Sequence, residues 1–172
     1  IPTDGDYYTV NRGGMQISDP RTPFAHIHGA GYRAIYDLSD PEASLFVVTP
    51  GFFLAALDPD TGKLQWHFQH VPGETLDLDE VFERVLVDVG EQKLLFTVGK
   101  AGILWKLDRK AGKFLDYKET VFQNVFSRID PKTGEKTINQ NAMPKIGQTT
   151  QNCPADPGAK AWQAASYSPR TQ

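Results

Sequence analysis

Two acidic residues, Asp77 and Asp79, stand two positions apart in a turn-prone acidic segment at residues 72–80. In an extended segment, side chains at i and i+2 project to the same side, so the two carboxylates would offer hard oxygen ligands close together. Such ligands suit calcium and similar hard cations. The spacing indicates a candidate metal site, but a solvated acidic loop explains it equally simply, and from the spacing alone we favour the loop.

Two other residue types could do chemistry. His26 and His28 occupy alternate positions and could place two metal ligands on one face of a strand, but no third or fourth ligand lies nearby in the sequence. We therefore favour solvated or structurally bonded histidines. Cys153 is the one cysteine, so no disulfide can form within the chain. A partner located elsewhere and a buried free thiol both stay open.

The elements that must position these residues are indicated by a pattern that occurs three times. In each copy an apolar run is followed by Asp-x-x-x-Gly and then by Lys or Glu-Lys, and the copies begin at Leu54, Leu104 and Phe126. An Asp side chain bonds the backbone of such a turn, and Gly takes the positive φ that closes it. Each copy predicts a strand, a tight turn and a returning strand. The repetition favours a β-propeller, whose blades are four-stranded antiparallel sheets.

Further strands are predicted from alternating or apolar runs. They are expected at residues 32–38, 44–49, 85–89, 93–98 and 121–126, the last directly ahead of the third turn. Residues 137–161 contain few apolar residues and many turn formers, which predicts a long loop.

The composition is ordinary for a globular protein and excludes several classes. The net charge of −3 gives no basic surface, so nucleic acid is not an expected partner. No apolar run approaches the roughly 20 residues that cross a bilayer, so no membrane span is expected in this chain. The chain has neither an initiator Met nor a signal-peptide pattern, which indicates that a signal was removed or that the start of the gene is missing.

Residues 1–51 differ in character from the rest of the chain and resemble the C-terminal end of the penicillin acylase family of N-terminal-nucleophile hydrolases. The resemblance is carried by Gly-Asp-x-x-Thr-Val-Asn, by His-Gly-x-x-Tyr-Arg-x-Ile-x-Asp-Leu-Ser-Asp-Pro, and by Ser-Leu followed by Thr-Pro-Gly. In that family Gln-Ser-Gly continues the Pro-Gly, whereas here Phe52 follows Gly51. The family's nucleophilic Ser and oxyanion-hole Asn have no counterparts, so no catalytic residue carries over. We predict a junction between residues 51 and 52.

Residues from about 52 to 172 resemble an internal stretch of the pyrroloquinoline-quinone (PQQ) dependent alcohol dehydrogenases, which are eight-bladed propellers. The combination Asp-x-x-Thr-Gly-x-x-x-Trp is specific, and the matching runs lie at residues 56–69, 72–83, 94–109, 152–154 and 162–169. The resemblance implies an all-β fold: a partial β-propeller of two to three incomplete blades at 52–172, preceded by a short β appendage in the acylase-like segment 1–51.

The resemblance also implies roles for particular residues. By motif position Asp77 is the catalytic base, and Lys100 is the cation that hydrogen-bonds the quinone oxygen. Asp77 and Asp79 are metal ligands, and the second carboxylate is the feature of members that use a lanthanide instead of calcium. Trp162 is a candidate cofactor neighbour, with blade packing as its alternative.

Two positions depart from the family pattern. Leu76 stands where many relatives have Trp, and Ala161 stands where an Asn that contacts the quinone is usual.

The function implied is oxidation of a small alcohol by metal-assisted hydride transfer to PQQ, with Ca²⁺ or a lanthanide as the metal. The electron acceptor would be a cytochrome c or similar protein, and the parent enzyme would be periplasmic. The family's other metal ligands, a Glu and an Asn, lie upstream of the matched stretch, so we expect this chain alone to be inactive. A penicillin acylase-like amide hydrolase fragment and a non-catalytic β-repeat module are the alternatives.

Overall fold

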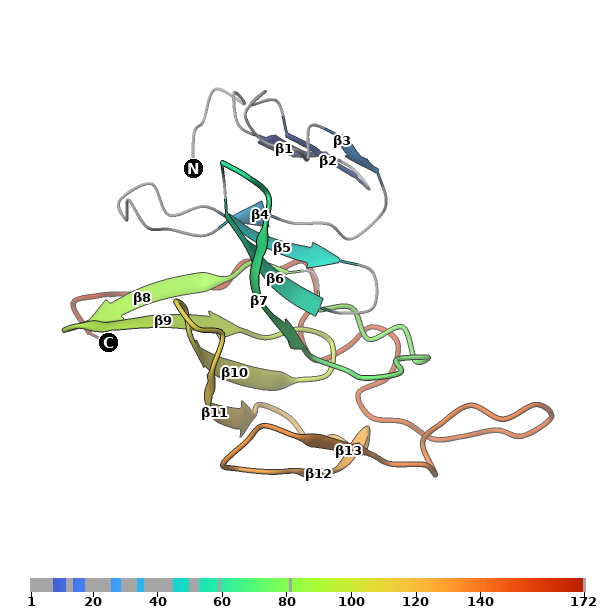
Figure 1. The fold of residues 1–172 in the computed structure, drawn as a ribbon. Helices are drawn as coiled ribbons and strands as arrows, with labels where there is room; N and C mark the ends of the chain where they lie inside the picture. Colours follow the sequence, from blue (N-terminus) through green and yellow to red (C-terminus); the bar gives the residue numbers. More distant parts are fainter. Residues whose placement is uncertain are drawn as a thin grey trace.

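The structure is a computed structural model that describes residues 53–58, 60–80 and 82–171, together with the backbone of five strands that precede residue 50. The described residues form thirteen strands and no helix (Figure 1). No helix long and apolar enough to cross a bilayer exists in this part of the chain. The strands are β1 (Tyr8–Asn11), β2 (Gly14–Ile17), β3 (His26–His28), β4 (Ala34–Ile35), β5 (Leu45–Thr49), β6 (Phe53–Leu57), β7 (Leu64–Gln69), β8 (Val85–Val89), β9 (Gln92–Thr97), β10 (Ile103–Asp108), β11 (Phe114–Glu119), β12 (Phe126–Ile129) and β13 (Lys136–Ile138).

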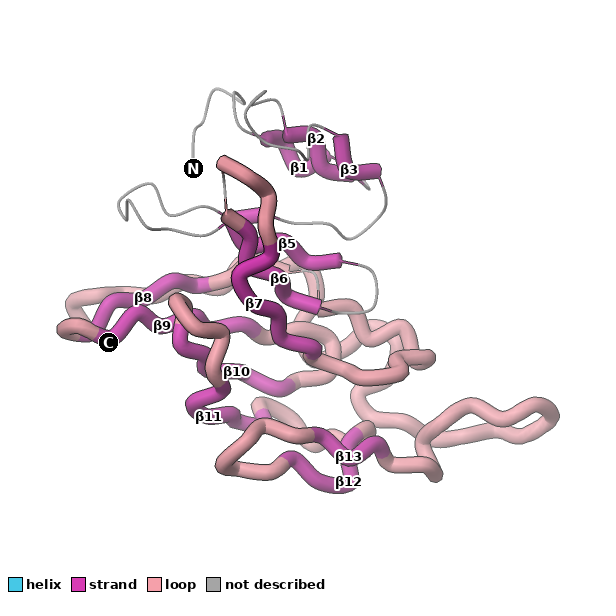
Figure 2. Tube along the Cα trace, in the orientation of Figure 1, coloured by secondary structure: helices cyan, strands magenta, loops and turns pink. Residues whose placement is uncertain are grey.

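Two of the sheets have the architecture of propeller blades. Strands β4 to β7 and strands β8 to β11 each form a four-stranded antiparallel sheet in which sequence neighbours are hydrogen-bonded neighbours (Figure 2). Strands β12 and β13 pair as a further hairpin, and β1 to β3 form a separate three-stranded sheet near the N-terminus. This arrangement confirms the all-β prediction of a partial β-propeller with an N-terminal β appendage.

The first blade-like sheet joins the two segments that the sequence separates. Its strands β4 and β5 precede residue 51, and β5 pairs with β6 over five residue pairs from Leu45↔Leu57 to Thr49↔Phe53. The junction predicted between residues 51 and 52 therefore lies between two paired strands of one sheet. The division into segments 1–51 and 52–172 stays a prediction.

Each Asp-x-x-x-Gly sequence forms the predicted tight turn. In the first turn, Asp58 Oδ1 accepts hydrogen bonds from the backbone N–H groups of Asp60 and Thr61, at 3.1 and 2.7 Å, while the N–H of Gly62 donates to Asp58 O at 2.8 Å. The hydroxyl and the backbone N–H of Thr61 hold the pKa of Asp58 below its usual value. The same contacts recur in the turns that begin at Asp108 and Asp130.

The turns also join neighbouring sheets. Gly112 has a φ of 65°, and a Cβ placed on it would lie 2.5 Å from ring atoms of Trp66, a residue of β7. The Trp66 indole Nε1 donates to Arg109 O in the same turn, at 3.1 Å. The third turn repeats the arrangement, because a Cβ on Gly134 would lie 2.5 Å from the Phe114 ring. Each later turn thus packs under an aromatic ring of the preceding sheet.

The core lies where the sheets meet and is centred on Trp105, which is fully buried. The Phe68 ring of β7 packs edge-on against Trp105, with the ring centroids 5.3 Å apart. Lys136 of β13 places its Nζ 3.9 Å from the centroid of the Phe68 ring and donates to Gln69 O at 2.7 Å. Burial lowers the pKa of Lys136 to about 8. One side chain therefore links the β12–β13 hairpin to β7 of the first blade-like sheet.

The strand predicted at residues 121–126 is wrong. The structure has an irregular segment there, and β12 begins only at Phe126. The side chain of Gln123 accepts from the N–H of Phe126 at 2.8 Å, and the N–H of Asn124 donates to Cys153 O at 2.8 Å. These contacts occupy the backbone groups that a strand pair would use. The predicted long loop is confirmed over residues 139–161, where one isolated bridge, Lys145↔Gln148, interrupts irregular structure.

Candidate functional site

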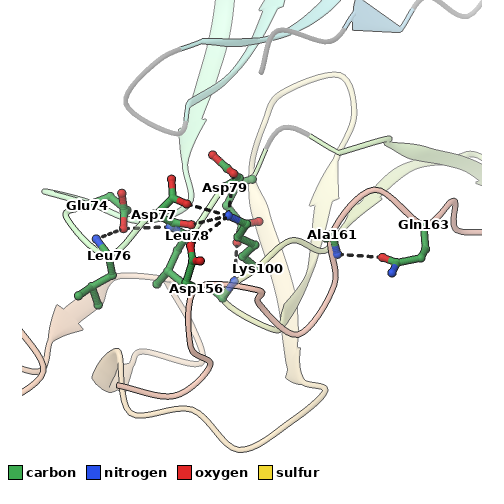
Figure 3. A network of polar contacts seen from close by, with 11 residues as sticks. Glu74, Leu76, Asp77, Leu78, Asp79, Lys100, Asp156, Ala161 and Gln163 are labelled. Carbon is green, nitrogen blue, oxygen red and sulfur yellow. Dashed lines mark hydrogen bonds and ion pairs between the residues drawn. The ribbon is translucent and has the colours of Figure 1, made fainter. Parts of the chain in front are cut away.

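Two separate chain segments bring the acidic pair and Lys100 together (Figure 3). Asp77 and Asp79 lie in the loop between β7 and β8, whereas Lys100 lies in the turn between β9 and β10. The backbone N–H of Lys100 donates to Asp79 O at 3.0 Å, which fixes the turn against the loop. The sheet that carries Lys100 thus positions the loop as well.

The Lys100 ammonium group is the centre of the cluster. Its Nζ lies 2.9 Å from Asp79 Oδ2, 3.1 Å from Asp77 Oδ2 and 2.9 Å from the Asp77 carbonyl oxygen. A third carboxylate, Asp156, approaches to 4.0 Å from the long C-terminal loop. The Lys100 side chain is 12% exposed and that of Asp77 is 69% exposed, so a half-buried cation faces an accessible carboxylate.

The charges of the cluster result from these contacts. The hydrogen bond from Lys100 is the main reason that the pKa of Asp77 lies below its usual value. Burial opposes the charged form of Lys100, but its bonds to Asp79 and Asp77 outweigh burial, and the pKa of Lys100 is raised. Near neutral pH, Asp77 is a carboxylate and Lys100 is a cation. In this state Asp77 is a weak base, because the hydrogen bond from Lys100 lowers its pKa and burial opposes this only slightly.

Glu80 ties the acidic loop to the same turn from inside the protein. Its side chain is 1% exposed, and Oε1 accepts from the backbone N–H of Ala101 at 3.2 Å. The carbonyl oxygen of Glu80 accepts from Arg84 Nη2 at 2.6 Å. Burial raises the pKa of Glu80 to about 8. No sequence pattern indicated a role for Glu80, although the residue lies in the acidic segment at residues 72–80.

The carboxylate oxygens of Asp77 and Asp79 are the type of ligand that hard cations bind, but two carboxylates are fewer ligands than such a cation needs. Asp77 and Asp79 present two carboxylates on one side of the loop, as Ca²⁺ or a lanthanide requires. Within residues 53–58, 60–80 and 82–171, no group of three or more His, Cys, Asp or Glu side chains is arranged to hold a metal ion. The side chains of His26 and His28 lie outside the described residues. The described segment therefore offers two carboxylates of the kind that binds such an ion, and both bond Lys100 Nζ in this structure.

Cys153 lies elsewhere in the long loop, and Trp162 directly follows this loop. The Trp162 side chain is 77% exposed, and its neighbour Ala161 donates to Gln163 Oε1 at 3.2 Å, apart from the Lys100 cluster (Figure 3). No contact of Trp162 with Asp77 or Lys100 occurs among the described interactions. Cys153 is a free, half-buried thiol whose Sγ lies 3.4 Å from the carbonyl oxygen of Phe122.

Sequence comparison connects this segment with known enzymes. The family model described as glucose/ethanol/alcohol dehydrogenase, β-propeller domain (PQQ), matches residues 52–121. The dehydrogenase subunit of alcohol dehydrogenase (quinone) of Komagataeibacter europaeus is 32% identical over 123 residues, which cover 69% of this chain and 17% of that protein. The quinohemoprotein alcohol dehydrogenase ADH-IIG of Pseudomonas putida is 32% identical over an alignment of 181 residues, gaps included, that covers 97% of this chain and 25% of that protein. At 97% coverage, this alignment also runs across residues 51 and 52.

Solved structures agree with the sequence matches. The structure of ADH-IIG from P. putida HK5 superimposes with a TM-score of 0.70 at 26% identity, over 83% of this chain and 25% of that chain. A europium-containing methanol dehydrogenase superimposes with a TM-score of 0.73 at 23% identity, over 99% of this chain and 31% of that chain, and shows the same fold. The chain thus spans between 17% and 31% of the length of these relatives. Residues 52–121 match the β-propeller domain of the PQQ-dependent glucose, ethanol and alcohol dehydrogenases, and the wider chain is similar to quinoprotein alcohol dehydrogenases.

Proposed function

We propose that this chain is part of a PQQ-dependent alcohol dehydrogenase and supplies Asp77, Asp79 and Lys100 to its active site. The observation that carries the proposal is the convergence of these three side chains, from two chain segments, inside a propeller segment of this family. The proposed substrate is a small primary or secondary alcohol. Among the residues that the structure describes, no comparable cluster favours the alternatives, an amide hydrolase fragment and a non-catalytic β-repeat module.

When bound, PQQ would supply the hydride acceptor and the metal ion would supply Lewis acidity. Asp77 would accept the proton of the alcohol hydroxyl group at its carboxylate. Lys100 would donate a hydrogen bond to a quinone oxygen and stabilise negative charge there. If Lys100 turns from Asp77 to the quinone, the main cause of the lowered Asp77 pKa is removed, and Asp77 becomes a stronger base.

The proposed metal is Ca²⁺ or a lanthanide, with Asp77 and Asp79 as two of its ligands. A trivalent ion needs more negative oxygen ligands than Ca²⁺ does, so the second carboxylate favours a lanthanide. The remaining ligands would come from the cofactor and from residues outside the described segment. The Trp162 side chain is exposed in this chain. We propose that it approaches the cofactor only when other residues of the longer protein cover it.

Asp79→Ala tests the lanthanide assignment in the full-length protein. We expect the variant to lose most of its activity with La³⁺ and to keep more of it with Ca²⁺, because it lacks the additional carboxylate. The measurement is alcohol-dependent dye reduction after loading with PQQ and either ion. Equal activity of the variant with both ions would remove this role from Asp79.

The proposed setting is the periplasm, and the proposed electron acceptor is a cytochrome c. The name of ADH-IIG, a quinohemoprotein, supports a haem as the next electron carrier. Because the chain spans 17% of one relative and 25% of another, the activity is proposed for the longer protein and not for these 172 residues alone.

The decisive experiment is expression of the complete gene that encodes this chain, followed by loading with PQQ and Ca²⁺ or La³⁺. We expect ethanol-dependent dye reduction. Asp77→Asn should abolish this activity, and the exposed control Asp116→Asn should retain it. Hydrolysis of a phenylacetyl amide without alcohol oxidation would favour the acylase alternative, and neither activity would favour the β-repeat module. Long-read sequencing through the codons for Gly51 and Phe52 tests whether segments 1–51 and 52–172 belong to one gene.

A further inference from the structure

The backbone of the acidic loop adopts a costly conformation at the residue proposed as the base. Asp77 has a φ of 58°, and it is the one non-glycine residue with a positive φ in the described part of the chain. An L-residue in this region costs on the order of 1 kcal/mol or more, although Asp tolerates it better than most. Such a conformation persists only where surrounding contacts enforce it.

Glu74 makes the contacts that enclose this residue. Its Oε1 accepts hydrogen bonds from the backbone N–H of Leu76 and from the backbone N–H of Leu78, the latter at 3.1 Å (Figure 3). These two residues flank Asp77 on either side. The Leu78 side chain is fully buried, which anchors the C-terminal side of the loop in the core. One carboxylate oxygen and one buried side chain thus fix the chain on both sides of Asp77.

The conformation decides which atoms of Asp77 face Lys100. Both the carbonyl oxygen and Oδ2 of Asp77 accept from Lys100 Nζ, at 2.9 and 3.1 Å, while Asp79 Oδ2 reaches the same atom at 2.9 Å. A rotation about φ of Asp77 would reorient the carboxylate relative to that of Asp79. The spacing of the two carboxylates therefore depends on the backbone between residues 74 and 78.

We propose that Glu74 is a positioning residue: it holds Leu76 and Leu78 so that Asp77 adopts its positive φ and shares Lys100 with Asp79. The chemistry that the carboxylate pair performs rests on the proposed function. The positioning itself rests on the loop contacts alone. Glu74 touches neither Lys100 nor the carboxylates of the pair in the described contacts, so it acts through the backbone.

The test is backbone amide hydrogen exchange in the 172-residue chain. In Glu74→Ala we expect the amides of Leu76 and Leu78 to exchange about tenfold faster, since each loses a charge-assisted hydrogen bond. Glu74→Gln keeps an acceptor oxygen and is expected to restore slow exchange. Glu91→Ala, at an exposed glutamate in the β8–β9 turn, is the matched control and should leave both amides unchanged. Unchanged exchange at Leu76 and Leu78 in Glu74→Ala, or equal acceleration throughout the chain, would overturn the proposal.

A second measurement remains informative even if Glu74→Ala is too unstable for exchange. In an Asp77→Gly background, glycine adopts the positive φ without support, so Glu74→Ala should lower the Tm less than it does when Asp77 is present. Additive Tm losses in the two backgrounds would contradict the role of Glu74. Neither measurement involves PQQ, a metal or an alcohol, so failure of the positioning role and failure of the proposed dehydrogenase activity are separate results.

Discussion

At the scale of single residues, Lys100 is the main influence on the pKa of Asp77. Its ammonium group bonds both carboxylates and a backbone oxygen, and only 12% of its side chain is exposed. A cation held this way favours the ionised form of the Asp77 carboxyl group. The Asp77 carboxylate and the Lys100 ammonium group are consequently both charged near neutral pH.

Lys100→Met should raise the pKa of Asp77 toward its usual value, because the largest cause of the lowered pKa is removed. Carboxyl ¹³C NMR titration of the 172-residue chain measures this change. The exposed control Lys118→Met should leave the Asp77 titration where it is. An Asp77 pKa that stays low in Lys100→Met would show that Lys100 is not the main cause of the shift.

Glu80 should make stability depend on pH. Its folded-state pKa of about 8 lies above its usual value because of burial, so the protonated form is favoured by folding. The resulting stability is fully present below the unfolded-state pKa of roughly 4.3 and is lost as the pH rises through 8, by up to about 1.4 kcal/mol per pH unit.

Glu80→Gln is expected to remove this component while keeping an acceptor for the N–H of Ala101. Urea unfolding at pH 5, 6.5 and 8 measures the effect. The difference in unfolding free energy between the variant and the natural chain should grow in favour of the variant as the pH rises. Parallel pH profiles would show that Glu80 does not titrate in this window.

The sequence could indicate Asp77, Asp79 and Lys100 as candidate residues, because motif position alone marks them. It could not indicate Glu74 or the positive φ of Asp77. A glutamate that bonds backbone N–H groups two and four residues later does so only when the loop turns back on itself, and that path is set by burial of Leu78. Local acidity gives no information on that path.

At the scale of elements, the repeated turns are the most predictable feature. An Asp at the first position and a Gly at the fifth are both required by local geometry, so the sequence suffices to place β6–β7, β10–β11 and β12–β13. The wrong strand at 121–126 shows the limit of such local inference. Its apolar residues resemble a strand, but Phe122 is 74% exposed and the neighbouring polar groups bond a distant loop.

Gly112→Ala should destabilise the chain by about 2 kcal/mol or more, because the new Cβ would meet the Trp66 ring at 2.5 Å and would also occupy a positive φ. Gly90→Ala is the matched control. Gly90 has a φ of 59° but no atom within 4 Å of an added Cβ, so this variant should lose only about 1 kcal/mol. Chemical unfolding of both variants measures the difference. Equal losses would show that the contact with Trp66 contributes nothing beyond backbone strain.

At the scale of the whole molecule, the described sheets account for a part of a propeller. The chain spans 17% of the K. europaeus relative and 25% of ADH-IIG, so most of the blades that close such a ring belong to other residues of those proteins. The Lys100 cluster is open to solvent on the side of Asp77. This chain alone would therefore contact the cofactor from one side only, whereas the complete ring of blades would enclose it.

The 172-residue chain by itself is expected to bind PQQ weakly and to oxidise no alcohol. Equilibrium dialysis with PQQ in the presence of Ca²⁺ or La³⁺, followed by dye reduction with ethanol, tests both statements. Saturable binding at micromolar PQQ would show that the 172-residue chain binds the cofactor by itself. Turnover that Asp77→Asn abolishes would show that it is active by itself.

Each aromatic ring that covers one of the repeated turns comes earlier in the sequence than the turn itself. Trp66 precedes the Gly112 turn that it covers, and Phe114 precedes the Gly134 turn. During synthesis, each ring leaves the ribosome before the turn that needs it, so every new hairpin meets a surface already made by earlier residues. A nascent chain can accordingly add its sheets one after another, and an interruption between β7 and β8 leaves the β4–β7 sheet complete.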